Sequence, residues 1–390
     1  MACTMLMACE GRRHAQRREE IRTAYHQIRS ELATKYPDWM KASEDAAFAP
    51  LLNRAWPLVG EWAATYLEAH PEASADEIAR AITALNPPRN CKESKDKCLD
   101  AYDLDTTAVQ LLTGKDAAYA VSTNFPHSGT LFVVARTETG RFRVAWNIKD
   151  LAAAHYASKD EIGYWAYLDF SWGDGPLVGM ISALVPSRNG RPRFYVDAWA
   201  AVFAGGTYPR QLSIWEWDGK AATPLLIKFY LASVETSGNE VVGDLLRVHT
   251  KGAYETFISC GMCREPEVIW TVRVTPDGVQ DLGREHVLPE LQMVDELWVR
   301  VTHGQSAADI ASPQVVRVIR QLISAMRREE GGTDPDLYLG MLFERKIVKE
   351  DNREVLHFSA ENLCSELRFE IDRSKGRPYF TRVHLAHPCE

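Results

Sequence analysis

The sequence has no long apolar run and no excess of positive charge, and each absence excludes a class of protein. No stretch approaches the ~20 consecutive apolar residues that a membrane-spanning helix needs. The formal net charge is −8 at pH 7, which argues against a nucleic-acid partner because phosphate binding requires a basic face. We therefore expect no transmembrane segment and no nucleic-acid partner.

The short motifs of several enzyme classes are also missing. There is no Walker phosphate loop, no HExxH zinc motif and no GxGxxG dinucleotide motif. This argues against ATPases, zinc-dependent proteases and dinucleotide enzymes, and no cofactor or metal is predicted. His127 precedes an expected strand but lacks the GxSxG elbow of hydrolases. It is a candidate acid or base if the protein is an enzyme, and a plain loop histidine otherwise.

What the chain does have is a repeated pair of strands joined by a turn. The clearest copy is Gln211–Ser233, with its turn at Asp218-Gly219. In its first strand Leu212 and Ile214 alternate with Trp215 and Trp217, so both faces are apolar. The return strand is almost continuously apolar, which predicts a sheet covered on both sides by other sheets.

Five further turns of the same kind are predicted, because Asn-Gly or Asp-Gly between two alternating strands indicates a hairpin. They lie at Gly140, Asn189-Gly190, Asp277-Gly278, Asp351-Asn352 and Lys375-Gly376. The predicted fold is therefore mainly β, built of antiparallel hairpin repeats. We expect a propeller-like arrangement, with a β-sandwich as the alternative.

Helical patterns flank these repeats. Residues 16–86 read as a helical region, in which Ser74 and Glu77 have the spacing of a capping box. A polar linker is expected over 87–116 and the antiparallel β domain over 117–304. Residues 305–390 are predicted to form a helix capped by Ser312 and a four-strand meander, either a last blade or a small α+β domain.

The N-terminal string Leu6-Met7-Ala8-Cys9 resembles the end of a bacterial lipoprotein signal. The resemblance implies that residues 1–15 are a truncated signal, that Cys9 is lipidated, and that the protein is periplasmic, secreted or lipid-anchored. A plain cytoplasmic N-terminus is the alternative.

The sequence has eight cysteines, and four of them form two pairs that are close in sequence, Cys91 with Cys98 and Cys260 with Cys263. In an oxidising compartment both pairs are disulfide candidates, and otherwise they are free thiols. The Cys260–Cys263 spacing is also that of a redox disulfide or half of a zinc site. A strand pattern follows it, however, and not the helix that a thioredoxin-like site needs.

The most site-like segment is Gly163–Gly179, which gathers aromatic rings and carboxylates. Its candidate binding residues are Tyr164, Trp165, Tyr167 and Trp172, and its candidate catalytic residues are Asp169 and Asp174. Rings stack on sugars while carboxylates take hydroxyls or supply acid and base, so a glycan site is predicted. The alternative is core aromatics with turn-forming aspartates.

The string Asp103–Thr107 matches the DxDxT motif of haloacid-dehalogenase-type phosphatases. That resemblance implies an attacking aspartate at the end of a buried strand, but the preceding residues do not form a strand pattern. A solvated acidic linker is the expectation here.

The preferred hypothesis is a non-catalytic binding or interaction protein of the bacterial cell envelope or exterior, with a protein or glycan ligand. A secreted glycan hydrolase or lyase and a thiol oxidoreductase at Cys260 and Cys263 are the alternatives.

Overall fold

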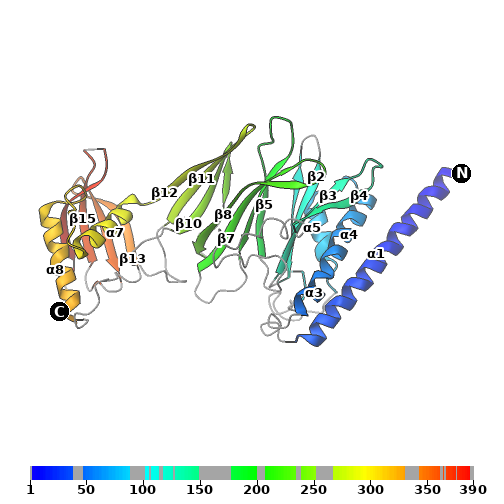
Figure 1. Ribbon diagram of the computed structural model, residues 1–390, viewed down its shortest axis with the longest axis horizontal. Helices are drawn as coiled ribbons and strands as arrows, with labels where there is room; N and C mark the ends of the chain where they lie inside the picture. The colour runs from blue at the N-terminus through cyan, green and yellow to red at the C-terminus, as the bar shows by residue number, and fades with distance from the viewer. Residues whose placement is uncertain are drawn as a thin grey trace. The chain divides into compact units, whose positions relative to one another are not determined.

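The computed structural model contains four antiparallel sheets of four strands each, together with several helices (Figure 1). It describes residues 2–37, 47–87, 102–104, 107–113, 117–125, 128–148, 177–199, 207–233, 239–251, 267–329, 342–360, 363, 366–374 and 376–386. The first unit comprises Met1–Phe203, Pro209–Tyr230 and Arg273–Gln280; the second comprises Ala204–Tyr208, Leu231–Val272 and Asp281–Glu390.

Every sheet is a meander, because its strand order follows the order of the chain. The first sheet consists of β1 Thr107–Leu112, β2 Ala118–Phe125, β3 Ser128–Arg136 and β4 Phe142–Asn147. The second consists of β5 Leu177–Leu184, β6 Arg193–Trp199, β7 Thr207–Trp217 and β8 Ala222–Ser233. The third consists of β9 Glu240–Val242, β10 Leu245–Lys251, β11 Glu267–Thr275 and β12 Gly278–His286. The fourth consists of β13 Leu342–Glu350, β14 Arg353–Ala360, β15 Glu366–Asp372 and β16 Tyr379–Ala386.

The predicted mainly β, antiparallel fold is confirmed, and the six predicted turns each join two neighbouring antiparallel strands. At the turn after β7, Gly219 adopts a φ of 92°, which favours glycine. The Asp218 carboxylate accepts the backbone N–H of Lys220 at 2.9 Å and that of Ala221 at 2.8 Å. These bonds, led by the one from Ala221, lower the pKa of Asp218. Each described sheet keeps two edge strands, so none closes into a barrel.

Helices α1 Ala2–Lys35, α3 Phe48–Asn53, α4 Ala55–Ala69 and α5 Ala75–Thr83 precede the first sheet, and α1 begins before the bounds of 16–86 that the sequence predicts for the helical region. The apolar stripe of α1 recurs every three or four residues and is buried at Ile21, Tyr25, Ile28, Leu32 and Tyr36. At α5 the predicted capping box is confirmed, since Ser74 accepts the Glu77 N–H and the Glu77 carboxylate accepts the Ser74 N–H.

The first sheet is buried on both faces because apolar residues occupy both alternating sets of positions. Val121, Phe132 and Val134 pack in one core with the N-terminal helices. Leu131 and Val133 point the other way and pack with second-sheet residues such as Trp215 and Trp217. Within this unit a helical layer, a sheet and a second sheet are therefore stacked.

In the second unit, helices α7 Pro289–Thr302 and α8 Pro313–Glu329 pack on one face of β13–β16. The predicted cap of α8 is confirmed, since the Ser312 hydroxyl accepts the Val315 N–H at 3.3 Å. The rings of Phe358, Phe369 and Phe380 lie at the centre of this core. The other face of the sheet carries charged side chains.

Three features differ from the sequence expectations. Strand β1 lies inside the predicted linker, and α7 lies where only strands were expected. On the return strand β8 the side chain of Leu225 is 38% exposed, so the sheet is not covered along the whole of this strand.

Within the part of the chain that the structure describes, no helix has both the length and the apolar character to cross a bilayer.

Candidate functional site

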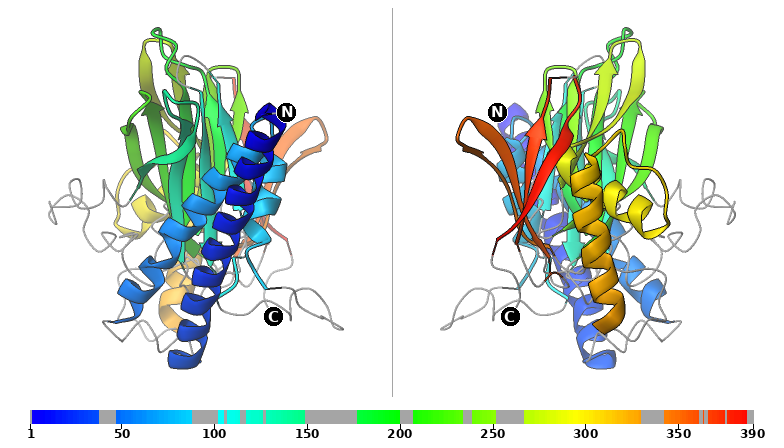
Figure 2. Two further views of the ribbon diagram at one scale, coloured as in Figure 1. Left: turned by 90° about the vertical axis from the view of Figure 1, so that its right-hand side faces the viewer. Right: turned by 90° about the vertical axis from the view of Figure 1, so that its left-hand side faces the viewer.

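A groove in the first unit is the best-formed concave site of the described residues. It lies between α4 and α1 on one side and β3 and β4 on the other, with a volume of about 730 Å³. Figure 2 (left) shows α1 and α4 side by side in front of the strands. We call it the α4 groove, and every turn of α4 from Trp56 to Glu68 contributes to its lining.

Its floor is apolar, because helix and sheet approach each other closely there. At Gly60 of α4 an added Cβ would lie 2.7 Å from the Cγ2 of Val144 on β4, so only glycine allows this approach. The apolar lining consists of Trp56, Pro57, Gly60, Ala64, Phe132, Phe142 and Val144. Trp56 and Phe132 are fully buried beneath the groove, whereas Phe142 and Val144 are half-buried.

The rim of the groove is polar and largely organised by α1. Arg17 of α1 donates from Nε to Glu61 of α4 at 2.9 Å and from Nη1 to Glu20 at 3.2 Å. His14 Nδ1 lies 3.3 Å from the Glu68 carboxylate. The polar lining as a whole is Arg17, Asn53, Glu61, Thr65, Glu68, Arg143 and Asn147. Both rim carboxylates are thus already engaged by side chains of α1.

Arg143 differs from the other charged residues of the rim. It is exposed on β4, and no ion pair is found for it within the described part of the chain. The strand that carries it is an edge of the first sheet, and its pairing with β3 shifts register between Val133 and Val134. Such an irregularity disrupts the outer ladder and discourages addition of another strand. In the register with β3, Arg143 pairs with Ala135 and lies on the face of β4 opposite Phe142 and Val144. The groove therefore offers side-chain contacts and not an exposed strand edge.

A second polar cluster lies inside the first unit on the face of the second sheet opposite Trp215. Asp197 on β6 accepts from Nη1 of Arg210 at 3.0 Å and from the Tyr230 hydroxyl at 2.7 Å. Burial and then the Asp197 carboxylate raise the pKa of Tyr230, and the same two causes raise the pKa of Tyr195 to about 12. Because Asp197 links β6 to Arg210 of β7 and Tyr230 of β8, we interpret the cluster as structural.

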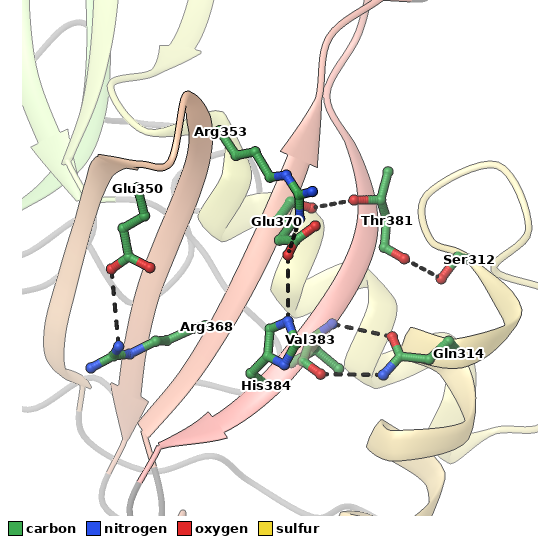
Figure 3. A network of polar contacts seen from close by, with 9 residues as sticks. All are labelled: Ser312, Gln314, Glu350, Arg353, Arg368, Glu370, Thr381, Val383 and His384. Carbon is green, nitrogen blue, oxygen red and sulfur yellow. Dashed lines mark hydrogen bonds and ion pairs between the residues drawn. The ribbon is translucent and has the colours of Figure 1, made fainter.

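The outer face of β13–β16 holds a third set of polar groups (Figure 3). Glu370 accepts from Arg353 Nη1 at 2.9 Å and lies 3.4 Å from His384 Nε2. The Gln314 side chain of α8 makes two hydrogen bonds to the backbone of Val383 on β16. It donates to the carbonyl and accepts from the N–H, both at 3.2 Å. These contacts link the strands to one another and to α8.

His357 lies at the centre of that face between two carboxylates. Its Nε2 is 2.7 Å from Glu350 and its Nδ1 is 2.6 Å from Glu366, while Arg368 Nε donates to Glu366 at 3.0 Å. No group of His, Cys, Asp or Glu with metal-binding geometry occurs among the described residues. We interpret the cluster as a cross-strand ion network.

The predicted solvated linker is wrong at Asp103. Its side chain is 3% exposed and accepts from Arg29 Nε of α1 at 2.7 Å. A carboxylate is buried here because a guanidinium from a distant helix pairs with it. Asp103 therefore anchors α1, and Asp105 and Thr106 lie outside the described residues.

The site residues predicted from sequence have no described side chains, so those assignments stay predictions. They are His127, Tyr164, Trp165, Tyr167, Asp169, Trp172, Asp174, Cys91, Cys98, Cys260 and Cys263. Cys9 falls within α1, but its side chain is likewise not described.

The α4 groove was not identified from sequence. Trp56 and Trp62 are buried on α4, but the opposite wall of the groove comes from β4, far along the chain. The one local signal was Gly60, since an isolated glycine inside a helical pattern often marks close approach of another element.

The chain matches no protein-family model, no curated protein and no solved structure.

Proposed function

We propose that this protein is a non-catalytic binding protein and that the α4 groove holds its ligand, a protein segment or a glycan. The observation that carries the proposal is the groove itself. Its volume of about 730 Å³ falls within the range of roughly 300–1,000 Å³ that is typical of ligand sites. An apolar floor with a small number of polar groups at the rim is the usual composition of such sites.

The arrangement of the rim supports a holding role. Glu61 is bonded to Arg17 and Glu68 lies beside His14, so side chains of α1 hold both rim carboxylates in place. The same contacts fix α1 beside α4, which keeps the groove preformed. A preformed site binds without the cost of ordering its walls.

Two sets of binding measurements test this proposal. Printed glycan and peptide arrays identify ligands of the wild-type protein, which are then titrated against two groove-blocking variants. Ala64→Leu fills the floor and Pro57→Trp fills the rim from an exposed position. We expect each to weaken binding at least tenfold, because bulk replaces the volume that the ligand occupies.

Ala69→Trp is the matched control, since Ala69 is exposed on the same helix and does not line the groove. It is expected to bind as the wild type does. Unchanged affinity in both blocking variants, or an equal loss in Ala69→Trp, would refute the assignment of the groove.

We further propose that the protein works in the bacterial cell envelope or exterior and that its meanders are arranged as propeller blades. The lipoprotein-like string at Cys9 and the two close cysteine pairs support the location. The four-stranded meander is the repeating unit of propellers, which supports the arrangement.

Mass spectrometry of the protein from its own host tests the location. We expect a lipid on Cys9 and disulfides that link Cys91 to Cys98 and Cys260 to Cys263. Eight free thiols and an unmodified Met1 would instead indicate a cytoplasmic protein.

A further inference from the structure

We infer that residues 13–20 of α1 form a strap along one wall of the α4 groove, and that opening of this strap sets how fast a bound ligand leaves. The inference rests on the proposed function, because it concerns the regulation of the same groove. It is drawn from the burial of side chains along α1 and from the contacts that join α1 to α4. We call residues 13–20 the α1 strap.

Burial divides α1 at Ile21. From that residue onward α1 buries one apolar stripe, which comprises Ile21, Tyr25, Ile28 and Leu32. In the same part of the helix Arg29 pairs with the buried carboxylate of Asp103. None of the side chains from Arg13 to Glu20 is buried. Most of the stability of a helix in a protein comes from packing of its apolar face, so the strap lacks the contribution that anchors the rest of α1.

The contacts that join the strap to α4 are polar and lie in solvent. Arg17 pairs with Glu61, and these side chains are 52% and 41% exposed. His14 lies 3.3 Å from the carboxylate of Glu68, and these side chains are 33% and 21% exposed. Exposed ion pairs add little to stability, because water screens the charges and ordering long side chains costs entropy. The strap is therefore held against α4 far more weakly than the part of α1 that follows it.

Opening of the strap changes the groove because Arg17 is part of its lining. The closed position is the one that the structure shows, with Arg17 in the same lining as Gly60 and Ala64 of the floor. Segments that bury few apolar contacts open locally at low free energy while the core stays folded. When the strap unwinds or swings away from α4, the groove loses that wall. A bound ligand then loses its contacts with the strap and dissociates faster.

Amide hydrogen exchange of the full-length protein measures the opening without any ligand. We expect the amides of residues 14–20 to exchange at least a hundredfold faster than those of residues 25–32, although both segments lie inside the same helix. His14→Gln should speed exchange in the strap further, because it removes the contact with Glu68. Equal protection of the two segments would overturn the inference.

Arg54→Gln is the matched control for the exchange measurement. Arg54 lies 3.5 Å from Glu31, so it forms an equally exposed ion pair with the anchored part of α1. Its loss should leave exchange in the strap unchanged. An equal acceleration in Arg54→Gln and His14→Gln would show that the strap does not open independently, and would also overturn the inference.

Glu19→Pro tests whether the opening governs ligand release. Glu19 is exposed and does not line the groove. Proline at this position removes a helix hydrogen bond and breaks α1 between the strap and Ile21. The probe is the glycan or peptide that binds the wild type most tightly on the printed arrays, and biolayer interferometry measures its dissociation. We expect dissociation from Glu19→Pro to be at least tenfold faster than from the wild type.

Glu19→Gln is the matched control, because it removes the same charge and the same ion pair with Arg22 but keeps the helix. It should release the probe at the wild-type rate. Unchanged dissociation from Glu19→Pro, or an equal increase in Glu19→Gln, would refute the role of the strap. Urea unfolding of Glu19→Pro should retain the wild-type midpoint, and loss of the folded state would show that the strap belongs to the core and is no separate element.

The outcome is separable from that of the proposed function. If Pro57→Trp weakens binding but Glu19→Pro releases the probe at the wild-type rate, the strap inference fails and the groove remains a ligand site. If neither Pro57→Trp nor Ala64→Leu affects any ligand, both fail, and fast exchange in the strap would place the error in the assignment of the groove.

Discussion

Replacing Asp197 by alanine is expected to lower the free energy of unfolding by about 3–5 kcal/mol, because it leaves the guanidinium of Arg210 buried without its carboxylate. The Asp197 side chain is only 2% exposed, and that of Arg210 only 10%. The change also removes the acceptor of the Tyr230 hydroxyl. Equilibrium unfolding in urea, followed by tryptophan fluorescence, measures the loss.

The control for this prediction replaces both charges together. Asp197→Leu combined with Arg210→Met removes the pair without leaving either charge alone, and such replacements are often neutral or stabilising. We expect the double variant to be much more stable than the sum of the single variants implies. Strictly additive losses would show that the two side chains do not act as a pair.

Replacing Phe369 by alanine is expected to cost about 3–5 kcal/mol in the second unit, since it removes a large ring from a closed core. Phe369 is fully buried on β15, and its ring centroid lies 4.7 Å from that of Phe380 and 6.5 Å from that of Phe358. The cavity left behind adds to the lost transfer free energy. Thermal and urea unfolding of the variant report the change.

Arg368→Ala is the matched control, because Arg368 neighbours Phe369 on the strand but points to the charged outer face. Its side chain is 36% exposed, so losing its ion pair should cost less than about 1 kcal/mol. Similar losses for the two variants would contradict the assignment of the core to the helical side of this sheet.

Local chemistry explains why much of the fold was predictable. Turn residues such as Asp218 and Gly219 fix a hairpin within a few positions, and the helix stripe from Ile21 to Tyr36 repeats every turn. The capping box at Ser74 needs only residues that lie three apart. These signals do not depend on where the rest of the chain goes.

The features that sequence did not predict depend on distant contacts. Asp103 was expected in a solvated linker, yet Arg29 of α1 pairs with it and allows its burial. The pairing of Asp197 with Arg210 depends on the register between β6 and β7, which composition does not reveal. The α4 groove likewise depends on a distant contact. It forms where β4 packs against α4, and these two elements lie far apart in the sequence.

The sequence-based glycan and thiol hypotheses centre on Asp169, Asp174, Cys260 and Cys263, which lie outside the described residues. The groove adds a different candidate, with a preformed apolar floor and a polar rim. The sequence-based hypotheses and the groove proposal place the functional residues at different positions. Substitutions at one set of positions are therefore expected to leave the function of the other set unchanged.

The most direct test of the central claim is the affinity of Pro57→Trp and Ala69→Trp for a ligand selected by the wild-type protein. We expect at least a tenfold loss for Pro57→Trp, which fills the groove, and no change for Ala69→Trp on the same helix. Wild-type affinity in Pro57→Trp would show that the ligand does not enter the α4 groove.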